Sequence, residues 1–237
     1  MDPVLLVIGY TAFTGLTNVI GGVAGRFEHL RRGQFRSSVL HGLVAFGGGT
    51  MLAAVALVLL PEGLKSMDAV SAGALLVVGA LVFLLLDEGI ERRGGPGAQF
   101  VAMVMDFIPG SLALGAVFGT GGALGPVLAV LLSMNNVPQG FNSYKELREK
   151  HWSPSRILGA IAVTIPIGVA SGLIGLFFLP AHPVVLAGLY VFSSGGLLYL
   201  MMHDIFPVAH QRKHWWPTML GVLGFLAGIL TEKIGTR

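Results

Sequence analysis

Eight apolar runs, each about 20 residues long, occupy most of the 237-residue chain. A helix of that length crosses the hydrocarbon core of a bilayer and satisfies its backbone hydrogen bonds within its own segment. The runs lie near 4–25, 39–60, 69–87, 98–118, 122–142, 156–179, 183–203 and 215–232. They predict an all-α polytopic membrane protein, with eight transmembrane helices in a single transmembrane domain over residues 1–237.

Charged residues are few and unevenly distributed among the loops. They make up 11% of the chain against 54% hydrophobic residues, which excludes an ordinary soluble protein. Alternate loops hold four, two, four and two of the 15 Lys and Arg residues, and the others are Lys65, Lys233 and Arg237. Basic loops face the cytoplasm. This distribution predicts a multi-pass protein of the cytoplasmic (inner) membrane with both termini outside, in contact with lipid and not with nucleic acid.

Two of the spans share a pattern in opposite orientation. The second contains Phe46-Gly-Gly-Gly49 and the seventh contains Phe192-Ser-Ser-Gly195, and a proline (Pro61 or Pro207) follows each phenylalanine after 15 residues. Because the two spans run in opposite directions, the match indicates an inverted repeat, which is typical of transporters. We therefore predict a three-two-three arrangement around a central pair of spans. The alternative is a chance similarity between glycine-rich helices.

The central pair carries two polar motifs, Asp106-Phe-Ile-Pro109-Gly-Ser and Asn135-Asn-Val-Pro138-Gln-Gly. Each has a polar residue three positions before a proline, which lipid tolerates only where neighbouring helices or a water-lined cavity satisfy the backbone. At 1.5 Å per residue, Asp106 and Asn135 lie about 12 Å and about 10 Å from the cytoplasmic ends of their spans. We expect two discontinuous helices whose polar residues meet at one depth, as in transporter substrate sites.

The residue types in these motifs suit a cation. Asp106, Asn135 and Gln139 are the candidate metal ligands, since Gln139 follows Asn135 by one helical turn. Carboxylate and amide oxygens suit a hard cation, or a hydrogen-bonding solute. The alternative is that Asp106 only joins two helices. Further candidates for the substrate site are Asn136, Ser111, Pro109 and Pro138.

Three residues at span ends are candidates for gating: Glu62, Asp204 and His203. The alternative is that they are interfacial residues at the membrane surface. The chain has no cysteine, which excludes disulfides and thiolate metal sites. No His-Glu-x-x-His or Gly-x-Ser-x-Gly motif occurs, so we expect neither an enzyme nor a bound cofactor.

At these motifs the chain resembles the ZIP (Zrt/Irt-like) metal transporters. The segment from Asp106 to Gly115 aligns without a gap with the first family motif, and the segment from Asn135 to Gly140 aligns with the second. The resemblance implies eight spans, both termini outside, an inverted repeat and a homodimer. It also implies that a divalent metal such as zinc is the substrate, carried through a site between the fourth and fifth spans.

The ligand positions depart from the pattern of that family. Asp106, Phe107 and Gly110 stand where the first motif has His, Asn and Glu, and Gln139 stands for the Glu of the second motif. Ile165 occupies what looks like the position of another ligand Glu. One formal charge remains in the central pair. Alternatives to cation transport are therefore transport of a neutral or organic solute on the same fold, or loss of transport.

Overall fold

The computed structural model describes residues 2–29, 35–92, 98–121, 124–209 and 216–235. This part of the chain is built of helices and contains no strand, which confirms the all-α prediction. Two short segments, η1 and η2, are π-helical. The elements are α1 (Pro3–His29), α2 (Phe35–Ala53), η1 (Ala54–Leu59), α3 (Leu60–Leu64), α4 (Ala69–Arg92), α5 (Ala98–Gly119), α6 (Gly125–Glu149), α7 (Pro154–Ala162), α8 (Thr164–Phe178), α9 (Pro183–Leu200), η2 (Met201–Ile205), α10 (Phe206–Ala209) and α11 (Trp216–Gly235).

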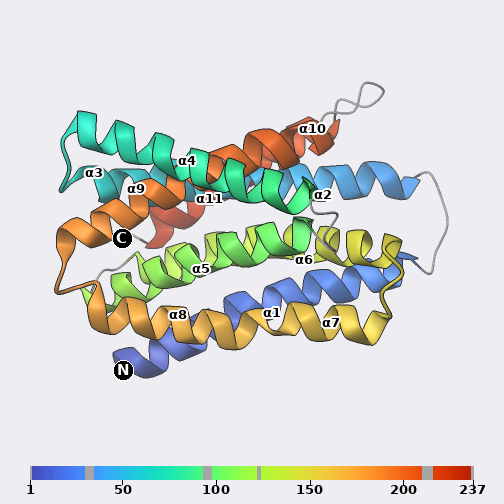
Figure 1. Ribbon diagram of the computed structural model, residues 1–237, viewed down its shortest axis with the longest axis horizontal. Helices are drawn as coiled ribbons and strands as arrows, with labels where there is room; N and C mark the ends of the chain where they lie inside the picture. Colours follow the sequence, from blue (N-terminus) through green and yellow to red (C-terminus); the bar gives the residue numbers. More distant parts are fainter. Residues whose placement is uncertain (1, 30–34, 93–97, 122–123, 210–215, 236–237) are drawn as a thin grey trace.

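The helices run along the long axis of the molecule, and the two termini lie at the same end of the bundle (Figure 1). The α5 and α6 helices, which carry the two polar motifs, lie in the middle, between α1, α7 and α8 on one side and α2, α4, α9 and α11 on the other. Five helical segments in the described ranges are long and apolar enough to cross a membrane: Pro3–Phe27, His41–Leu64, Ala69–Gly89, Pro154–Phe178 and Pro183–His203.

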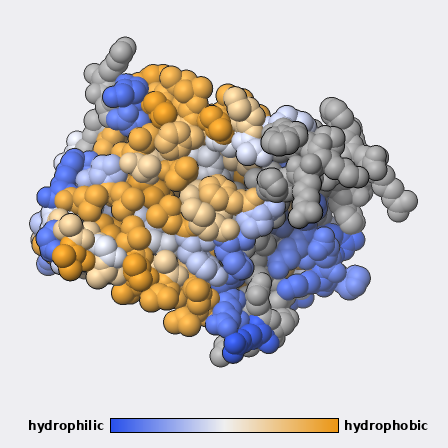
Figure 2. All heavy atoms as spheres, turned by 90° about the horizontal axis from the view of Figure 1, so that it is seen from above, coloured by the Kyte–Doolittle hydropathy of each residue, from blue (hydrophilic) through white to orange (hydrophobic). Residues whose placement is uncertain are grey.

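The outer surface is apolar where a bilayer would contact it. Figure 2 shows hydrophobic atoms over the middle of one face and hydrophilic atoms gathered towards the two ends of the long axis. Large exposed apolar side chains occur on α4, α8, α9 and α11, among them Val70, Leu85, Phe177, Val184 and Ile234. In water such a surface would be strongly unfavourable. The protein is a multi-pass membrane protein.

The pairwise packing of the helices has an internal symmetry. The α1 helix packs on α6 as α8 packs on α5, and α2 packs on α11 as α9 packs on α4. The contact of α2 with α6 likewise has its counterpart in that of α9 with α5. Exchanging the first three spans with the last three, and α5 with α6, therefore turns each of these contacts into its counterpart. This is the exchange that the predicted inverted repeat requires.

Equivalent glycines make these contacts. A Cβ atom on Gly49 would lie 1.9 Å from the carbonyl oxygen of Gly221, and one on Gly195 would lie 1.9 Å from that of Leu76. Gly49 and Gly195 are the residues that the sequence pattern placed in register. Helix backbones approach this closely in membranes only where small residues permit it. The two halves therefore use the same residue at the same contact.

The π-helical segments also match. The η1 segment ends before Leu60 and Pro61, and the η2 segment ends before Phe206 and Pro207. A proline has no N–H to donate to the preceding turn, and one wide turn is a common way to accommodate that loss. In both spans, therefore, the helix has a wider turn just before the proline that the two spans share.

The expectation of discontinuous central helices was wrong. The α5 helix continues through Pro109, and the α6 helix continues through Pro138 and on to Glu149, beyond the predicted end at 142. The ring of Pro138 packs against Gly47 of α2, where a Cβ atom would lie 2.6 Å from its Cγ. Because α6 is enclosed by its neighbours, packing offsets the hydrogen bond that the proline removes. A one-residue interruption occurs instead at Val163, between α7 and α8, where the backbone keeps right-handed helical dihedral angles.

Candidate functional site

The carboxylate of Asp106 is buried between α5 and α6, with 4% of the residue exposed. The Gln139 side chain donates a hydrogen bond from Nε2 to Asp106 Oδ2 at 2.5 Å, and Asn135 donates from Nδ2 to the same oxygen at 3.3 Å. These helices are joined by a short connection and run antiparallel (Figure 1). The structure thus brings together the three residues that the sequence singled out as metal ligands.

Both amides leave an oxygen atom unused. Asn135 Oδ1 and Gln139 Oε1 are buried and have no hydrogen-bond partner among the described residues. A buried acceptor without a partner costs about 1–3 kcal/mol. The amide nitrogens hold the carboxylate in place, while carboxylate and amide oxygens remain as ligands. The group therefore presents unpaired oxygen atoms of the kind that a cation or a hydrogen-bond donor could contact.

The other four predicted substrate-site residues have different surroundings. Asn136 faces α1, where its Nδ2 donates to the backbone oxygen of Thr14 at 2.9 Å. Ser111 is fully buried, and its hydroxyl has no partner within the described part of the chain. Pro138 is buried against α2 and Pro109 is half-buried. In the described part of the chain Asp106 accepts its hydrogen bonds from Asn135 and Gln139, so the compact cluster consists of these three residues.

Apolar groups occupy the neighbouring positions where the resembled family has further ligands. The ring of Phe107 lies over Gly168 of α8, where a Cβ atom would lie 2.6 Å from ring Cε1. The backbone of Ile165 packs against Gly15, where a Cβ atom would lie 2.9 Å from the Ile165 Cα. Within the described ranges, no group of three or more His, Cys, Asp or Glu side chains could hold a metal ion. Any metal at Asp106 would depend on amide oxygens.

The candidate gating residues lie at opposite ends of the bundle. Glu62 in α3 is half-buried and pairs with Lys65, with 2.5 Å between Glu62 Oε1 and Lys65 Nζ. His203 in η2 lies near Asp87 of α4, with 3.2 Å between His203 Nδ1 and Asp87 Oδ2. The backbone of Asp204 belongs to η2, but its side chain is outside the described residues.

Asp87 and Asn18 are among the buried polar residues that were missed from the sequence. Asp87 is 8% exposed and accepts a hydrogen bond from the Tyr199 hydroxyl at 3.0 Å, besides its contact with His203. Asn18 in α1 is fully buried, and neither of its amide atoms has a partner in the described ranges. The sequence could have indicated both residues, because each is a polar residue inside or at the end of an apolar run.

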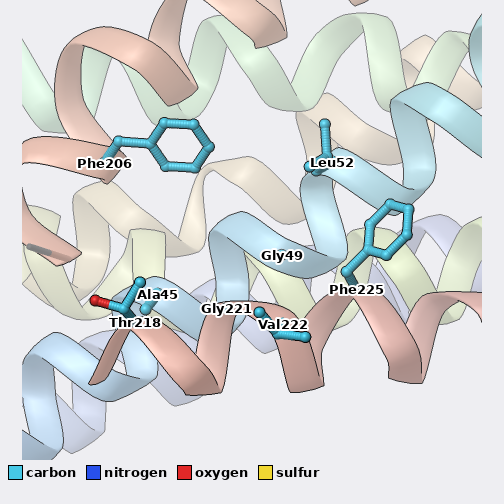
Figure 3. A pocket seen from close by; sticks show the side chains of 8 residues that line it. All are labelled: Ala45, Gly49, Leu52, Phe206, Thr218, Gly221, Val222 and Phe225. Atoms are coloured by element: carbon cyan, nitrogen blue, oxygen red, sulfur yellow. The ribbon is translucent and has the colours of Figure 1, made fainter. Parts of the chain in front are cut away.

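A separate cavity of about 350 Å³ lies between α2, α10 and α11 (Figure 3). In Figure 3, Phe206 and Phe225 border it on either side of the α2–α11 contact at Gly49 and Gly221. Thr218 is the one polar side chain among its lining residues. The cavity therefore offers little to a cation. The residues that line it are Ala45, Gly49, Leu52, Phe206, Thr218, Gly221, Val222 and Phe225.

No protein-family model matches this chain, and no curated protein matches it either.

Proposed function

We propose that this protein is a transporter that moves a divalent metal cation across the cytoplasmic membrane through the site between α5 and α6. The observation that carries the proposal is the buried Asp106 carboxylate with two amide side chains bonded to it. A charged group inside a membrane span costs about 2.5–3.5 kcal/mol on insertion scales and usually marks a substrate or ion pathway. A purely structural role would not require unused amide oxygens beside it.

The wider architecture supports the same proposal. Transporters built from inverted repeats bind their substrates between the halves, and α5 and α6 are the pair that the repeat exchanges. The sequence motifs resemble ZIP transporters, and we infer the same three-two-three arrangement and a homodimer for this chain. By the positive-inside rule, the basic loops support an orientation in which the end of the bundle with α7 and α10 faces the cytoplasm and both termini lie outside.

A neutral hydrogen-bonding solute is the rival substrate. The observation that favours it is the pair of unused acceptors, Asn135 Oδ1 and Gln139 Oε1, which N–H or O–H groups of a solute could satisfy. It leaves the charge of Asp106 without a counter-charge, whereas a cation would supply one. Charge compensation therefore favours the cation.

Uptake into proteoliposomes tests the proposed function. Vesicles that contain the purified protein and an internal metal-sensitive dye should take up Mn²⁺ or Zn²⁺ along a saturable curve, and protein-free vesicles should not. Transport of a neutral solute would instead appear as osmotic swelling without a change in the dye signal. The absence of saturable cation uptake at an inward-negative potential would overturn the proposal.

The Gln139→Glu substitution should tighten divalent-cation binding at this site by at least about tenfold, because ligand charge count is a main determinant of affinity for hard cations. The variant replaces the amide that donates to Asp106 Oδ2 with a second carboxylate. Calorimetry with Mn²⁺ would measure the change. Asn142→Asp, which adds the same charge one turn farther along α6, is the matched control. Equal gains in the two variants would show that added charge alone, and not the site, determines binding.

A further inference from the structure

A second cavity lies at the end of the bundle where α3 and the start of α9 meet the α5–α6 connection. Its volume is about 370 Å³. Its polar lining comprises Glu62, Lys65, Ser66, Thr120 and Tyr190. Apolar residues form the rest of the wall, namely Val117, Leu124, Pro183, Leu186 and Ala187. In the proposed orientation the end of the bundle that carries α3 faces the outside of the cell (Figure 1).

The cavity lies in line with Asp106 but is closed off from it. Val117, which lines the cavity, follows Asp106 by eleven residues on the same face of α5, about 16 Å along the helix. Ala113, Leu128 and Leu132 belong to the apolar core between these two levels, and all three are buried. An ion in the cavity would therefore be held at a separate site, before any passage to Asp106.

The ion pair in this cavity is easily displaced. The Lys65 side chain is 65% exposed and that of Glu62 is 27% exposed. Exposed ion pairs stabilise a protein by only about 0–1 kcal/mol, because water screens the charges and the long side chain loses freedom. A divalent cation carries twice the charge of the ammonium group. It can thus compete for Glu62 at a small cost.

We propose that this cavity captures a hard divalent cation, which displaces Lys65 from Glu62 and uses hydroxyl groups of the lining as further oxygen ligands. Ser66 and Thr120 supply such oxygens, and no thiolate is available anywhere in the chain. Oxygen ligands favour Mn²⁺, Mg²⁺ or Ca²⁺ over softer metals. The capture site's role in transport rests on the proposed function, but its ability to bind the ion does not. Lys65 acts as the resting counter-ion that the cation replaces.

A fluorine label near the cavity tests the binding. Because the chain has no native cysteine, Ala181→Cys gives a single attachment point, and Ala181 is exposed two residues before Pro183, which lines the cavity. The label is placed in an Asp106→Asn background, which removes the charge of the central site. We expect Mn²⁺ to broaden the fluorine resonance along a saturable curve. The absence of saturable broadening in this background would overturn the proposal.

Three substitutions test whether Glu62 and Lys65 determine the binding of Mn²⁺ in the cavity. Glu62→Gln should weaken the apparent Mn²⁺ affinity by at least about tenfold, because it removes the carboxylate ligand. Lys65→Gln should strengthen it by about threefold, because the competing ammonium is gone. Asp68→Asn is the matched control and should leave the affinity unchanged, since Asp68 does not line the cavity. Hydrogen bonds from the Ser71 side chain and backbone hold the pKa of Asp68 below its usual range, so it is ionised at neutral pH.

The binding and flux measurements can fail independently, so they test the capture site and the proposed transport separately. Equal affinities in the Glu62→Gln and Asp68→Asn proteins would overturn the capture site. Weaker Mn²⁺ binding in Lys65→Gln would overturn it too, because Lys65 would then support the bound ion instead of competing with it for Glu62. In proteoliposomes with intact Asp106, Glu62→Gln should raise KM and leave kcat unchanged, because capture precedes the passage through the central site. The absence of wild-type flux would count against transport alone, and the Mn²⁺ titration would still decide the capture site.

Discussion

Asp106→Asn is expected to lower divalent-cation flux by at least about a hundredfold while the protein remains folded. At an effective dielectric constant of about 20, two unit charges about 4 Å apart attract by roughly 4 kcal/mol, and each 1.4 kcal/mol corresponds to about tenfold. Asp106 is the one charged residue in the described cluster with Asn135 and Gln139. Its charge therefore supplies most of the attraction that offsets dehydration of the cation.

The fold should survive this substitution because Asn retains the size of Asp and one side-chain oxygen. That oxygen can still accept the hydrogen bond that Gln139 now donates to Asp106 Oδ2. Flux into proteoliposomes and thermal unfolding in detergent would be measured on the same preparations. Asp2→Asn makes the same chemical change at an exposed position before α1 and serves as the control. A stable Asp106→Asn protein with undiminished flux would show that Asp106 has only a structural role.

Gly195→Ala is expected to be among the most destabilising substitutions of a single methyl group in this protein. The added Cβ atom would lie 1.9 Å from the Leu76 carbonyl oxygen, a distance that no real contact reaches, and the obstacle is backbone. The α9 and α4 helices must therefore move apart along a contact that small residues make possible. Overpacking of a core costs about 1–3 kcal/mol and occasionally more.

A matched control exists in the same helix pair. Gly73 of α4 has no atom within 4 Å of its would-be Cβ, so Gly73→Ala should be neutral or stabilising by up to about 1 kcal/mol. Thermal unfolding and the yield of monodisperse protein would compare the two variants. Gly49→Ala should resemble Gly195→Ala, because its Cβ would meet the Gly221 carbonyl oxygen at the same 1.9 Å. Equal stability of the Gly195→Ala and Gly73→Ala proteins would refute the close helix contact.

The two predictions test different parts of the helix packing. The glycine contacts hold α2 to α11 and α9 to α4, whereas Asp106 lies on the central pair that these helices flank. A loss of transport without a loss of stability at Asp106, and the opposite at Gly195, would separate the functional site from the framework around it.

The sequence by itself determined the helical class, the approximate spans and the three residues of the central cluster. Helix formation in lipid is a local property, because each apolar segment must satisfy its own backbone hydrogen bonds wherever it later packs. The one-turn spacing of Asn135 and Gln139, and the matching depth of Asp106, were likewise readable from helix geometry. The register of Gly49 with Gly195 followed from the same local pattern.

Only the tertiary structure decided which side chains became partners and whether the prolines broke their helices. Asn136 is adjacent to Asn135 in the chain but bonds to Thr14, 122 residues away, and Asp87 bonds to Tyr199, 112 residues away. Such pairings depend on which helix faces meet, and small residues far apart in the sequence determine how closely the helices approach. Pro138 remains within a continuous helix because Gly47 of another span leaves room for its ring. No local pattern around Pro138 contains that information.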